Sequence, residues 1–447
     1  MLLITLALVL IQFLIAVVAP KRFIYFALWW QTIPYTWNWD SQLVYETPIG
    51  PLNVVAMQMF GFCMACLLVL VFHSQATGPQ FRRVRWHAAF IGFCVLSVIY
   101  APSVAYGLRM IAKLLGPLLF LVTILVVVKS AEELRKMRIA ILGSGMILLA
   151  LALIARASGI NSDPNSVQTG MSGLGPPGMG PPVFSAHMLP VAMLALAIFI
   201  SEKRMLILAI AIASALAILG ALQRTSAGAL YLGFSLILFA GTRGFWRLLL
   251  PVTGLLGLPA LMIFSESFRR RMFYGDASSQ QLLADPEKAA NSINSSGRFD
   301  MWDSMLRRFF EPHPILGSGI GSTQEFFYTR SGSGVVHSEY VRLLCEVGLV
   351  GVGLFLIALL SHLARMYRYC RRGTSTESRA LGLAAMGAVI CYAVYCATDN
   401  AFDYVTQFGI YVFGLVAMAI TASKLPDTVA QMPRTSVAAE LFPNLIR

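Results

Sequence analysis

The chain has few charged residues. Only 12% of its 447 residues are Asp, Glu, Lys or Arg, whereas 57% are hydrophobic, and an ordinary soluble domain carries roughly 25% charge. A soluble globular fold is therefore excluded. The strict alternation of apolar and polar residues that marks a transmembrane β-barrel is also missing. In its place stand apolar runs of about 18 to 25 residues, each long enough to cross the bilayer as a helix. We predict an all-α, polytopic transmembrane helical bundle.

The apolar runs predict twelve or thirteen spans. The uncertain span is 23–36, which is short and contains Pro34, so a broken element and an interfacial helix both stay open for it. We expect crossings close to residues 2–19, 23–36, 53–73, 87–102, 105–128, 137–157, 184–200, 205–222, 225–241, 246–265, 338–363, 381–398 and 406–423.

Basic residues outnumber acidic ones by 34 to 21. Most of the excess lies in short loops between apolar runs, which is the pattern of positive charge retained on the cytoplasmic side of a membrane. Membrane topology therefore accounts for the positive net charge, and we expect membrane lipids but no nucleic acid as partners. The loops that this rule places in the cytoplasm contain Arg82–Arg85, Lys129–Arg138, Lys203–Arg204, Arg243–Arg247 and Arg365–Arg379.

This orientation divides the chain into N-terminal transmembrane helices (1–265), a periplasmic loop (266–336), C-terminal transmembrane helices (337–423) and a cytoplasmic tail (424–447). The loop is the only outer segment large enough to fold. Within it, residues 300–311 place apolar side chains on one side and charged ones on the other. This pattern predicts an amphipathic helix that lies along the outer membrane surface.

Ionisable residues gather inside or beside the outer ends of the predicted spans, where they are unfavourable and are therefore candidates for function. Arg109 and Lys113 are four residues apart and share a helix face. Glu339, Arg342 and Glu346 form a stripe of paired charges, for which structural ion pairing is the alternative.

His337 stands at the start of the apolar run 338–363. The positive end of a helix dipole favours the neutral, proton-accepting imidazole. This position predicts a catalytic histidine, although a structural role is the commoner one for a single histidine.

Three motifs follow one another in the second half of the chain. They read Gly297-Arg298-x-x-x-Trp302, His313-Pro314-Ile315-Leu316-Gly317-x-Gly319-x-Gly321 and His337-Ser338-x-Tyr340-x-x-Leu343-x-x-Glu346-x-Gly348-x-x-Gly351. In this order they resemble the signature of the bacterial O-antigen ligase and O-antigen polymerase superfamily. The resemblance covers residues 220–365, and the other helices agree only in number and hydrophobicity.

The resemblance implies an inverting glycosyltransferase of the bacterial inner membrane with its active site facing the periplasm. The donor would be an undecaprenyl-diphosphate-linked glycan, and the acceptor a sugar hydroxyl of lipid A core or of another lipid-linked repeat, in lipopolysaccharide or exopolysaccharide synthesis. By this analogy His337 is the general base, and Arg224 and Arg298 bind the diphosphate. Guanidinium groups suit a leaving diphosphate because they neutralise its charge without giving up a proton. Arg109, Lys113, Glu339 and Arg342 would support the site.

The sequence departs from the family pattern around Arg224. Members commonly show Ser-Arg-Gly or Ser-Arg-Thr there, whereas this chain reads Gln223-Arg224-Thr225-Ser226-Ala227-Gly228. Either Arg224-Thr225 matches the Arg-Thr variant, or Ser226-Ala227-Gly228 matches Ser-Arg-Gly with the arginine lost. We prefer the first register because it keeps the arginine. In the second, Arg109 or Lys113 would share the diphosphate.

We predict no metal and no cofactor. A divalent cation needs clustered oxygen ligands, yet the chain has no Asp-x-Asp and its first outer loop offers only Asp40 and Glu46. Asp399 and Asp403 are interpreted as solvated loop carboxylates, with acceptor binding as the alternative. The seven cysteines avoid the longest polar loop, so no disulfide framework is expected there.

Two other functions stay open. A repeat polymerase of the same superfamily performs the same bond chemistry on a different acceptor. A non-enzymatic transporter of lipid-linked oligosaccharides would also place cations near an anionic headgroup.

Overall fold

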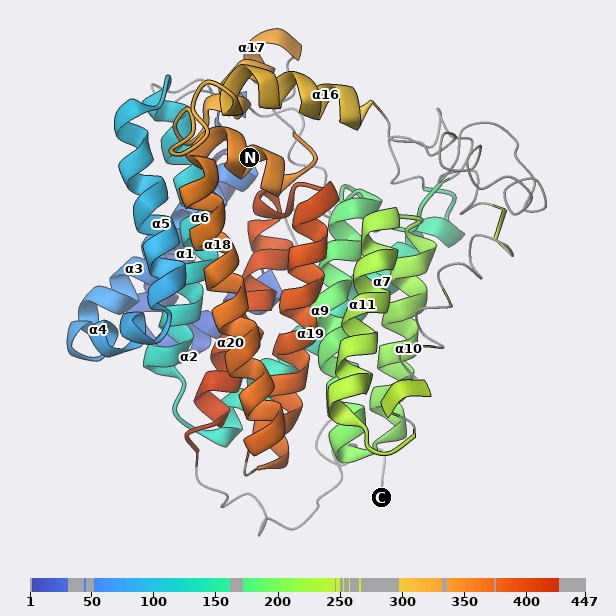
Figure 1. The fold of residues 1–447 in the computed structure, drawn as a ribbon. Helices are drawn as coiled ribbons and strands as arrows, with labels where there is room; N and C mark the ends of the chain where they lie inside the picture. Colours follow the sequence, from blue (N-terminus) through green and yellow to red (C-terminus); the bar gives the residue numbers. More distant parts are fainter. Residues whose placement is uncertain are drawn as a thin grey trace.

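The computed structural model is a bundle of helices that run between two ends, with two short helices lying across one end (Figure 1). The structure describes residues 2–30, 44–45, 52–160, 172–245, 247–249, 252, 257, 265–266, 297–331, 336–373 and 375–425. The predicted amphipathic stretch forms α16 (Arg298–Met305) and the π-helical turn η3 (Leu306–Phe310). With α17 (Ser322–Ser331), α16 covers the end where α6, α11 and α18 begin.

The N-terminal half contains a short hairpin and seven helices within the described ranges. The strands β1 (Val44–Tyr45) and β2 (Leu52–Asn53) pair antiparallel, with Val44 opposite Asn53. The helices are α1 (Leu2–Val18), α2 (Pro20–Trp30), α3 (Val54–Phe72), α4 (Ser74–Arg83), α5 (Arg85–Ser97, continued by the 3-10 turn η2, Val98–Tyr100), α6 (Val104–Val127) and α7 (Ala131–Ala157).

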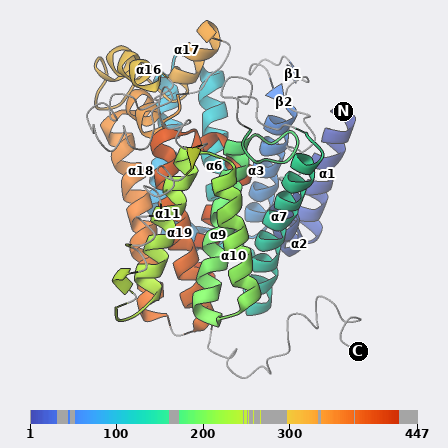
Figure 2. The same ribbon diagram turned by 90° about the vertical axis from the view of Figure 1, so that its right-hand side faces the viewer.

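The remaining helices complete the bundle and pack against those of the N-terminal half (Figure 2). They are α9 (Pro181–Glu202), α10 (Met205–Gly220), α11 (Arg224–Gly241), α18 (Glu339–Arg372), α19 (Thr376–Thr398) and α20 (Ile410–Ala422). Between α19 and α20 lie the 3-10 turn η4 (Ala401–Asp403) and the π-helical turn η5 (Val405–Gly409).

The predicted helical membrane bundle is confirmed, whereas the number of spans stays a prediction. Within the described residues six helical segments are long and apolar enough to cross a membrane. They are Val104–Val127, Ala131–Ala157, Pro181–Glu202, Glu339–Arg372, Thr376–Thr398 and Val405–Ala422. A bent pair, Met57–Phe72 and Ser74–Arg83 at 112°, would add a seventh. The expected spans 2–19, 87–102 and 205–222 correspond to shorter apolar helices, and 225–241 corresponds to α11, which has 18 residues but is not among the six. The run 246–265 lies almost wholly outside the described residues.

Two local differences from the expected spans have sequence reasons. The uncertain run 23–36 gives α2, which has eleven residues and begins at Pro20, where the missing N–H of proline costs no hydrogen bond. The helix α4 was not predicted, because its sequence is polar and contains Pro79. It therefore shows no apolar run.

The helices α19, α20 and α6 form the centre of the bundle. The helix α19 packs against α9, α11, α18 and α20, and every residue of α20 is buried. At the periphery, α1 and α10 expose large apolar side chains such as Leu14, Val18, Leu206 and Leu216. Such exposure suits helices that face lipid tails rather than water.

The predicted amphipathic stretch is helical, and part of its apolar side packs against protein. Met305 packs with Val336 and Cys345, and Trp302 donates from Nε1 to the carbonyl of Val336 at 2.9 Å. Its charged side is exposed and carries an ion pair between Arg307 and Asp303. Phe299 is 63% exposed and Phe309 and Phe310 are half-buried, and the position of the helix along the outer membrane surface stays a prediction.

The helix α18 is interrupted at Gly348, whose φ of 62° and ψ of −166° are not helical. A loop fills the break. The amides of Ser318 and Gly319 donate to the carbonyls of Cys345 and Glu346, and the amides of Leu349 and Val350 donate to those of Pro314 and Ile315, at 2.9 to 3.2 Å. The loop backbone thus takes over hydrogen bonds that an unbroken helix would make with itself. We call residues 314–319 the inserted loop.

Candidate functional site

The candidate site lies at the covered end of the bundle, where α18 begins and α19 ends. The motif residues around it have visible local roles. Gly297 adopts a φ of 71°, which an L-residue rarely takes, and this turn starts α16 at Arg298. Ser338 is the N-cap of α18, because its hydroxyl accepts a hydrogen bond from the amide of Val341 at 3.4 Å.

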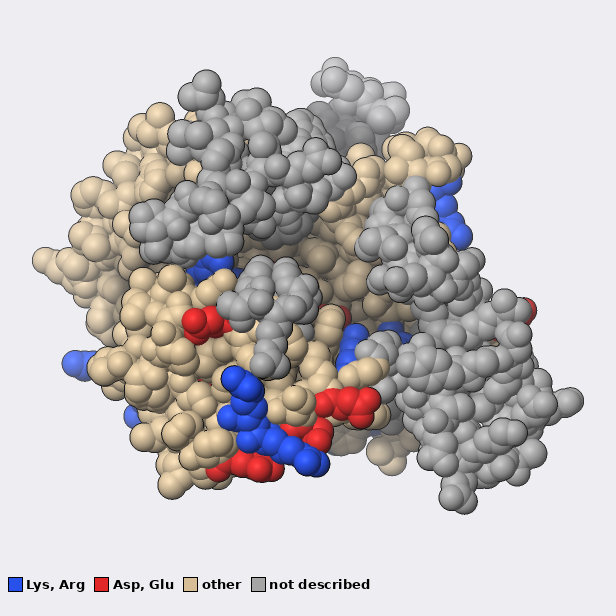
Figure 3. All heavy atoms as spheres, turned by 90° about the horizontal axis from the view of Figure 1, so that it is seen from above, with Lys and Arg blue, Asp and Glu red and all other residues tan. Residues whose placement is uncertain are grey.

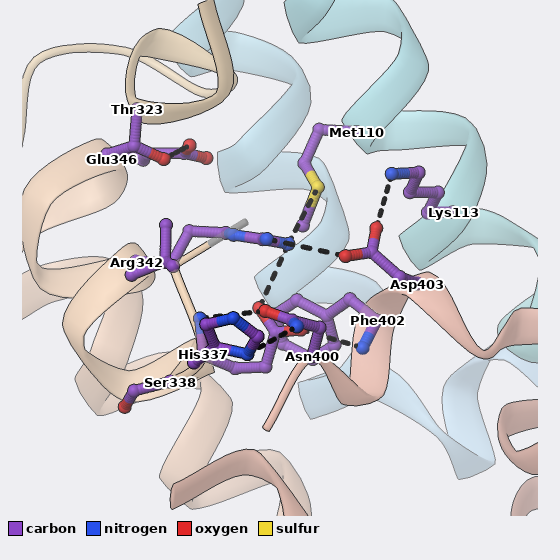
Figure 4. A network of polar contacts seen from close by, with 12 residues as sticks. Met110, Lys113, Thr323, His337, Ser338, Arg342, Glu346, Asn400, Phe402 and Asp403 are labelled. Carbon is purple, nitrogen blue, oxygen red and sulfur yellow. Dashed lines mark hydrogen bonds and ion pairs between the residues drawn. The ribbon is translucent and has the colours of Figure 1, made fainter. Parts of the chain in front are cut away.

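His337 precedes this cap in a left-handed conformation, with a φ of 55°. Asn400, in the turn after α19, contacts it twice. The backbone N–H of His337 donates to Asn400 Oδ1 at 2.9 Å, and Asn400 Nδ2 lies 3.2 Å from His337 Nδ1. Figure 4 shows the imidazole and the amide facing each other. The histidine is therefore held by residues far away in the sequence.

A buried ionic network adjoins the histidine (Figure 4). Arg342 is 1% exposed and contacts Glu339, which is 0% exposed, at 3.1 Å. Arg342 also contacts Asp403 at 3.5 Å, and Asp403 in turn pairs with Lys113. Glu339 additionally accepts the amide N–H of Phe402 at 2.8 Å. Because buried charges are unfavourable unless paired and hydrogen-bonded, this network fixes α6, α18 and the turn after α19 relative to one another.

The electrostatic surroundings keep His337 neutral. Burial, followed by the positive charges of Arg298 and Arg342, lowers the pKa of His337 to about 4, while Asp403 opposes the shift. Burial alone would raise the pKa of Asp403, but Lys113 and Arg342 hold that pKa below its usual value. At neutral pH the site therefore combines a neutral imidazole with an ionised carboxylate.

Arg298 and the start of α11 meet at the last residue of α19. The guanidinium of Arg298 donates from Nη1 to the carbonyl of Thr398 at 2.6 Å. The hydroxyl of Thr398 lies 2.5 Å from that of Thr225. Arg224 immediately precedes Thr225 as the first residue of α11. Both predicted diphosphate-binding arginines thus lie near Thr398, and both side chains are half-buried.

The supporting residues divide into two groups. Lys113, Glu339 and Arg342 belong to the ionic network described above. Arg109 lies one turn earlier on α6, where its guanidinium is 5.6 Å from the centroid of the Tyr106 ring. Arg109 is thus placed against an aromatic ring, whereas Lys113 is tied to the network.

The predicted stripe on α18 pairs only in part. Arg342 and Glu339 form an ion pair, as expected. Glu346 instead accepts hydrogen bonds from the amide of Gly321, at 2.9 Å, and from the hydroxyl of Thr323. These hydrogen bonds hold residues 321–323, which follow the inserted loop, against α18.

The interpretation of Asp399 and Asp403 as solvated carboxylates is wrong. Asp399 is 6% exposed, and burial raises its pKa above the usual value. Asp403 is paired with two cations from other helices. Asn400 was not singled out by its sequence. One sequence signal could have found these residues. The short turn between two apolar runs contains carboxylates but no basic residue, so its carboxylates need cations from other parts of the chain.

The surface of this end is recessed. Viewed from above, basic and acidic side chains share one edge of the face, and further basic side chains are visible in its hollows (Figure 3). Among the described residues, no group of three or more His, Cys, Asp or Glu side chains is placed to hold a metal ion.

Comparison with known proteins gives one family. Residues 189–356 match the family model described as O-antigen ligase. No curated protein matched the chain. The matched region contains Arg224, Arg298 and His337, whereas Asn400 and Asp403 lie beyond it. The order of the three motifs, the helical membrane fold and this match together support membership of the chain in the O-antigen ligase and polymerase superfamily.

Proposed function

We propose that the protein is an O-antigen ligase-type inverting glycosyltransferase. It moves a glycan from undecaprenyl diphosphate to a sugar hydroxyl in the synthesis of lipopolysaccharide or another surface polysaccharide. The proposal places the protein in the bacterial inner membrane, with twelve or thirteen crossings and with α16 and the site on the periplasmic side. The observation that carries it is geometric: Arg298 and Thr225, the second residue of the helix that begins with Arg224, both contact Thr398, two residues before the Asn400 that contacts His337.

In the proposed reaction the acceptor hydroxyl oxygen bonds to the anomeric carbon of the donor, and the bond from that carbon to the diphosphate oxygen breaks. The hydroxyl proton passes to His337. Arg298 and Arg224 neutralise the charge that develops on the leaving diphosphate, which is where preorganised cations contribute most to rate.

The pKa of His337 has to rise for this reaction. A base is most effective when its pKa lies near the working pH, and a pKa of about 4 is low for that purpose. Burial is the first cause of the low value and the charge of Arg298 the second. A bound diphosphate would offset the charge of Arg298, so we expect donor binding to raise the pKa of the imidazole by that part of the shift.

The test is transfer by purified protein from undecaprenyl-diphosphate glycan, with lipid A core and a lipid-linked repeat as separate acceptors. We also propose that no metal is required, so the assay contains a chelator. His337→Ala should insert normally and transfer nothing, while His313→Ala, which removes an exposed histidine, should transfer like wild type.

Near wild-type transfer by His337→Ala would exclude the general-base role. Loss of wild-type transfer in chelator, restored by magnesium, would exclude the metal-independent reaction. Transfer to lipid A core alone identifies a ligase, and transfer to the lipid-linked repeat alone identifies a polymerase.

A further inference from the structure

We infer that Asn400 is a positioning residue that holds His337 as the Nε2–H tautomer, with the imidazole lone pair on Nδ1. The assignment follows from which atoms of the two residues can donate a hydrogen bond and which can accept one.

The backbone of His337 fixes the orientation of the Asn400 side chain. A backbone N–H can only donate, and it lies 2.9 Å from Asn400 Oδ1. If the amide were turned over, its NH2 group would face this N–H and two donors would oppose each other. The assignment of the amide oxygen and nitrogen therefore follows from the main chain.

The amide then fixes the tautomer. With Oδ1 facing the backbone, Nδ2 faces His337 Nδ1 at 3.2 Å. Nδ2 has hydrogens but no lone pair to offer, so Nδ1 must accept. A neutral imidazole has one N–H and one acceptor nitrogen, and its proton must consequently reside on Nε2.

The turn that carries Asn400 is itself held. The amide N–H of Asn400 donates to Asp399 Oδ1 at 2.8 Å, and the hydroxyl of Tyr404 donates to the same oxygen at 3.2 Å. Asn400 is 4% exposed, so water does not compete for its amide while no acceptor is bound. The left-handed conformation of His337 is kept by the same contact.

The charges that act on the imidazole favour its neutral form. Only the neutral imidazole has two tautomers, because the imidazolium has a proton on both nitrogens. Burial opposes protonation most, followed by Arg298 from α16 and Arg342 from α18, whereas among the described residues Asp403 favours it.

The consequence for catalysis rests on the proposed function. A general base uses its lone pair, so the acceptor hydroxyl must meet His337 at Nδ1, where it replaces the Asn400 amide. The O–H bond breaks and an N–H bond forms at Nδ1, which leaves an imidazolium with a proton on each nitrogen. In this scheme the Asn400 amide stays hydrogen-bonded to Nδ1 of His337 until the acceptor binds.

The direct test is nitrogen NMR of full-length protein labelled with ¹⁵N-histidine and held in lipid nanodiscs at neutral pH. The His337 resonances are assigned by their loss in His337→Gln. We expect a protonated Nε2 and an unprotonated Nδ1. A protonated Nδ1 in the wild type would overturn the inference.

The near-isosteric variant Asn400→Asp should reverse the tautomer of His337. In Asn400→Asp one carboxylate oxygen can keep the backbone N–H while the other accepts from Nδ1–H, so the proton should move from Nε2 to Nδ1. Transfer should fall at least tenfold, because the lone pair then lies on the wrong nitrogen. Asn53→Asp in β2 makes the same chemical change outside the site and should alter neither readout.

Unchanged resonances in a folded Asn400→Asp would count against the inference, and if this variant does not fold, the wild-type spectrum alone decides. The inference and the proposed function fail separately. A protonated Nε2 together with full transfer by His337→Ala would refute the function and leave the tautomer standing. A protonated Nδ1 together with an inactive His337→Ala would do the reverse.

Discussion

His337 owes its neutral state to groups from several elements. Burial and the cations Arg298 and Arg342 all work against protonation, so the folded protein binds this proton less tightly than the unfolded chain does. The contribution of His337 to stability is therefore complete above its ordinary pKa of 6.5 and is lost as the pH falls toward about 4. The histidine that we propose as the base is thus kept unprotonated over the neutral range.

Removing one of the two cations should raise this pKa. In Arg298→Gln we expect the His337 pKa to rise above 4 toward 6.5, while burial and Arg342 still hold it below that value. The measurement is a pH titration of the His337 nitrogen resonances. Arg307→Gln removes an arginine whose side chain is 70% exposed and serves as the control. An unchanged or lower pKa in Arg298→Gln would contradict this electrostatic account.

The sequence predicts some of these residues and not others, for a physical reason. His337 could be predicted because it stands at the start of an apolar run and within a family motif, and Arg298 because it lies in the motif that begins with Gly297. The polar turn that holds Asn400 and Asp403 is visible in the sequence, but the contacts of these residues are not, because their partners are distant in the chain. Asp403 meets Lys113 across 290 residues, and no periodicity encodes that contact.

At the scale of the element, the break in α18 depends on Gly348. A Cβ there would lie 2.4 Å from the carbonyl oxygen of Ile315 and 2.6 Å from the amide of Gly317. Its φ and ψ also fall in a region that is open essentially to glycine alone. The inserted loop can approach the helix this closely only because the side chain is missing.

We expect Gly348→Ala to destabilise the protein by at least about 2 kcal/mol, through backbone strain and overpacking. The readout is the thermal unfolding midpoint in detergent. Gly353→Ala is the matched control, since a Cβ at Gly353 meets no atom within 4 Å, and it should not lower the midpoint. Equal midpoints for the two variants would show that the close approach at Gly348 is not required.

Elements with strong apolar runs could be predicted from sequence, and the others could not. The runs 105–128 and 381–398 correspond closely to α6 and α19. The helix α4 has no such run, and the break at Gly348 lies inside an unbroken apolar stretch that reads as one helix. Hydropathy reports burial in lipid or protein, but it contains no information on where the backbone leaves helical geometry.

For the whole molecule, the two ends of the bundle differ in charge chemistry. The covered end has the buried network around Arg342. At the opposite end the pairs are less deeply buried, such as those of Arg138 with Glu202 and Glu377, and the exposed Arg371 and Arg372 end α18. This division agrees with the sequence assignment of segments to two sides, although which side is periplasmic stays part of the proposal.

Single cysteines can test that orientation. All seven native cysteines are free and buried, so background labelling should be low. In intact spheroplasts a membrane-impermeant maleimide should label Arg307→Cys at the covered end and leave Arg371→Cys unlabelled until the cells are lysed. The opposite pattern would place the site in the cytoplasm and rule out the periplasmic reaction.

The inserted loop affects the orientation of the half of α18 that follows His337. The two halves of α18 are joined at Gly348 by hydrogen bonds to residues 314–319, not by a continuous helical ladder. The angle between the half that begins at Glu339 and the half that ends at Arg372 is therefore set by a short segment that precedes the helix in sequence. A change of length or sequence confined to that segment should therefore tilt the half of α18 next to His337 against the half that ends at Arg372.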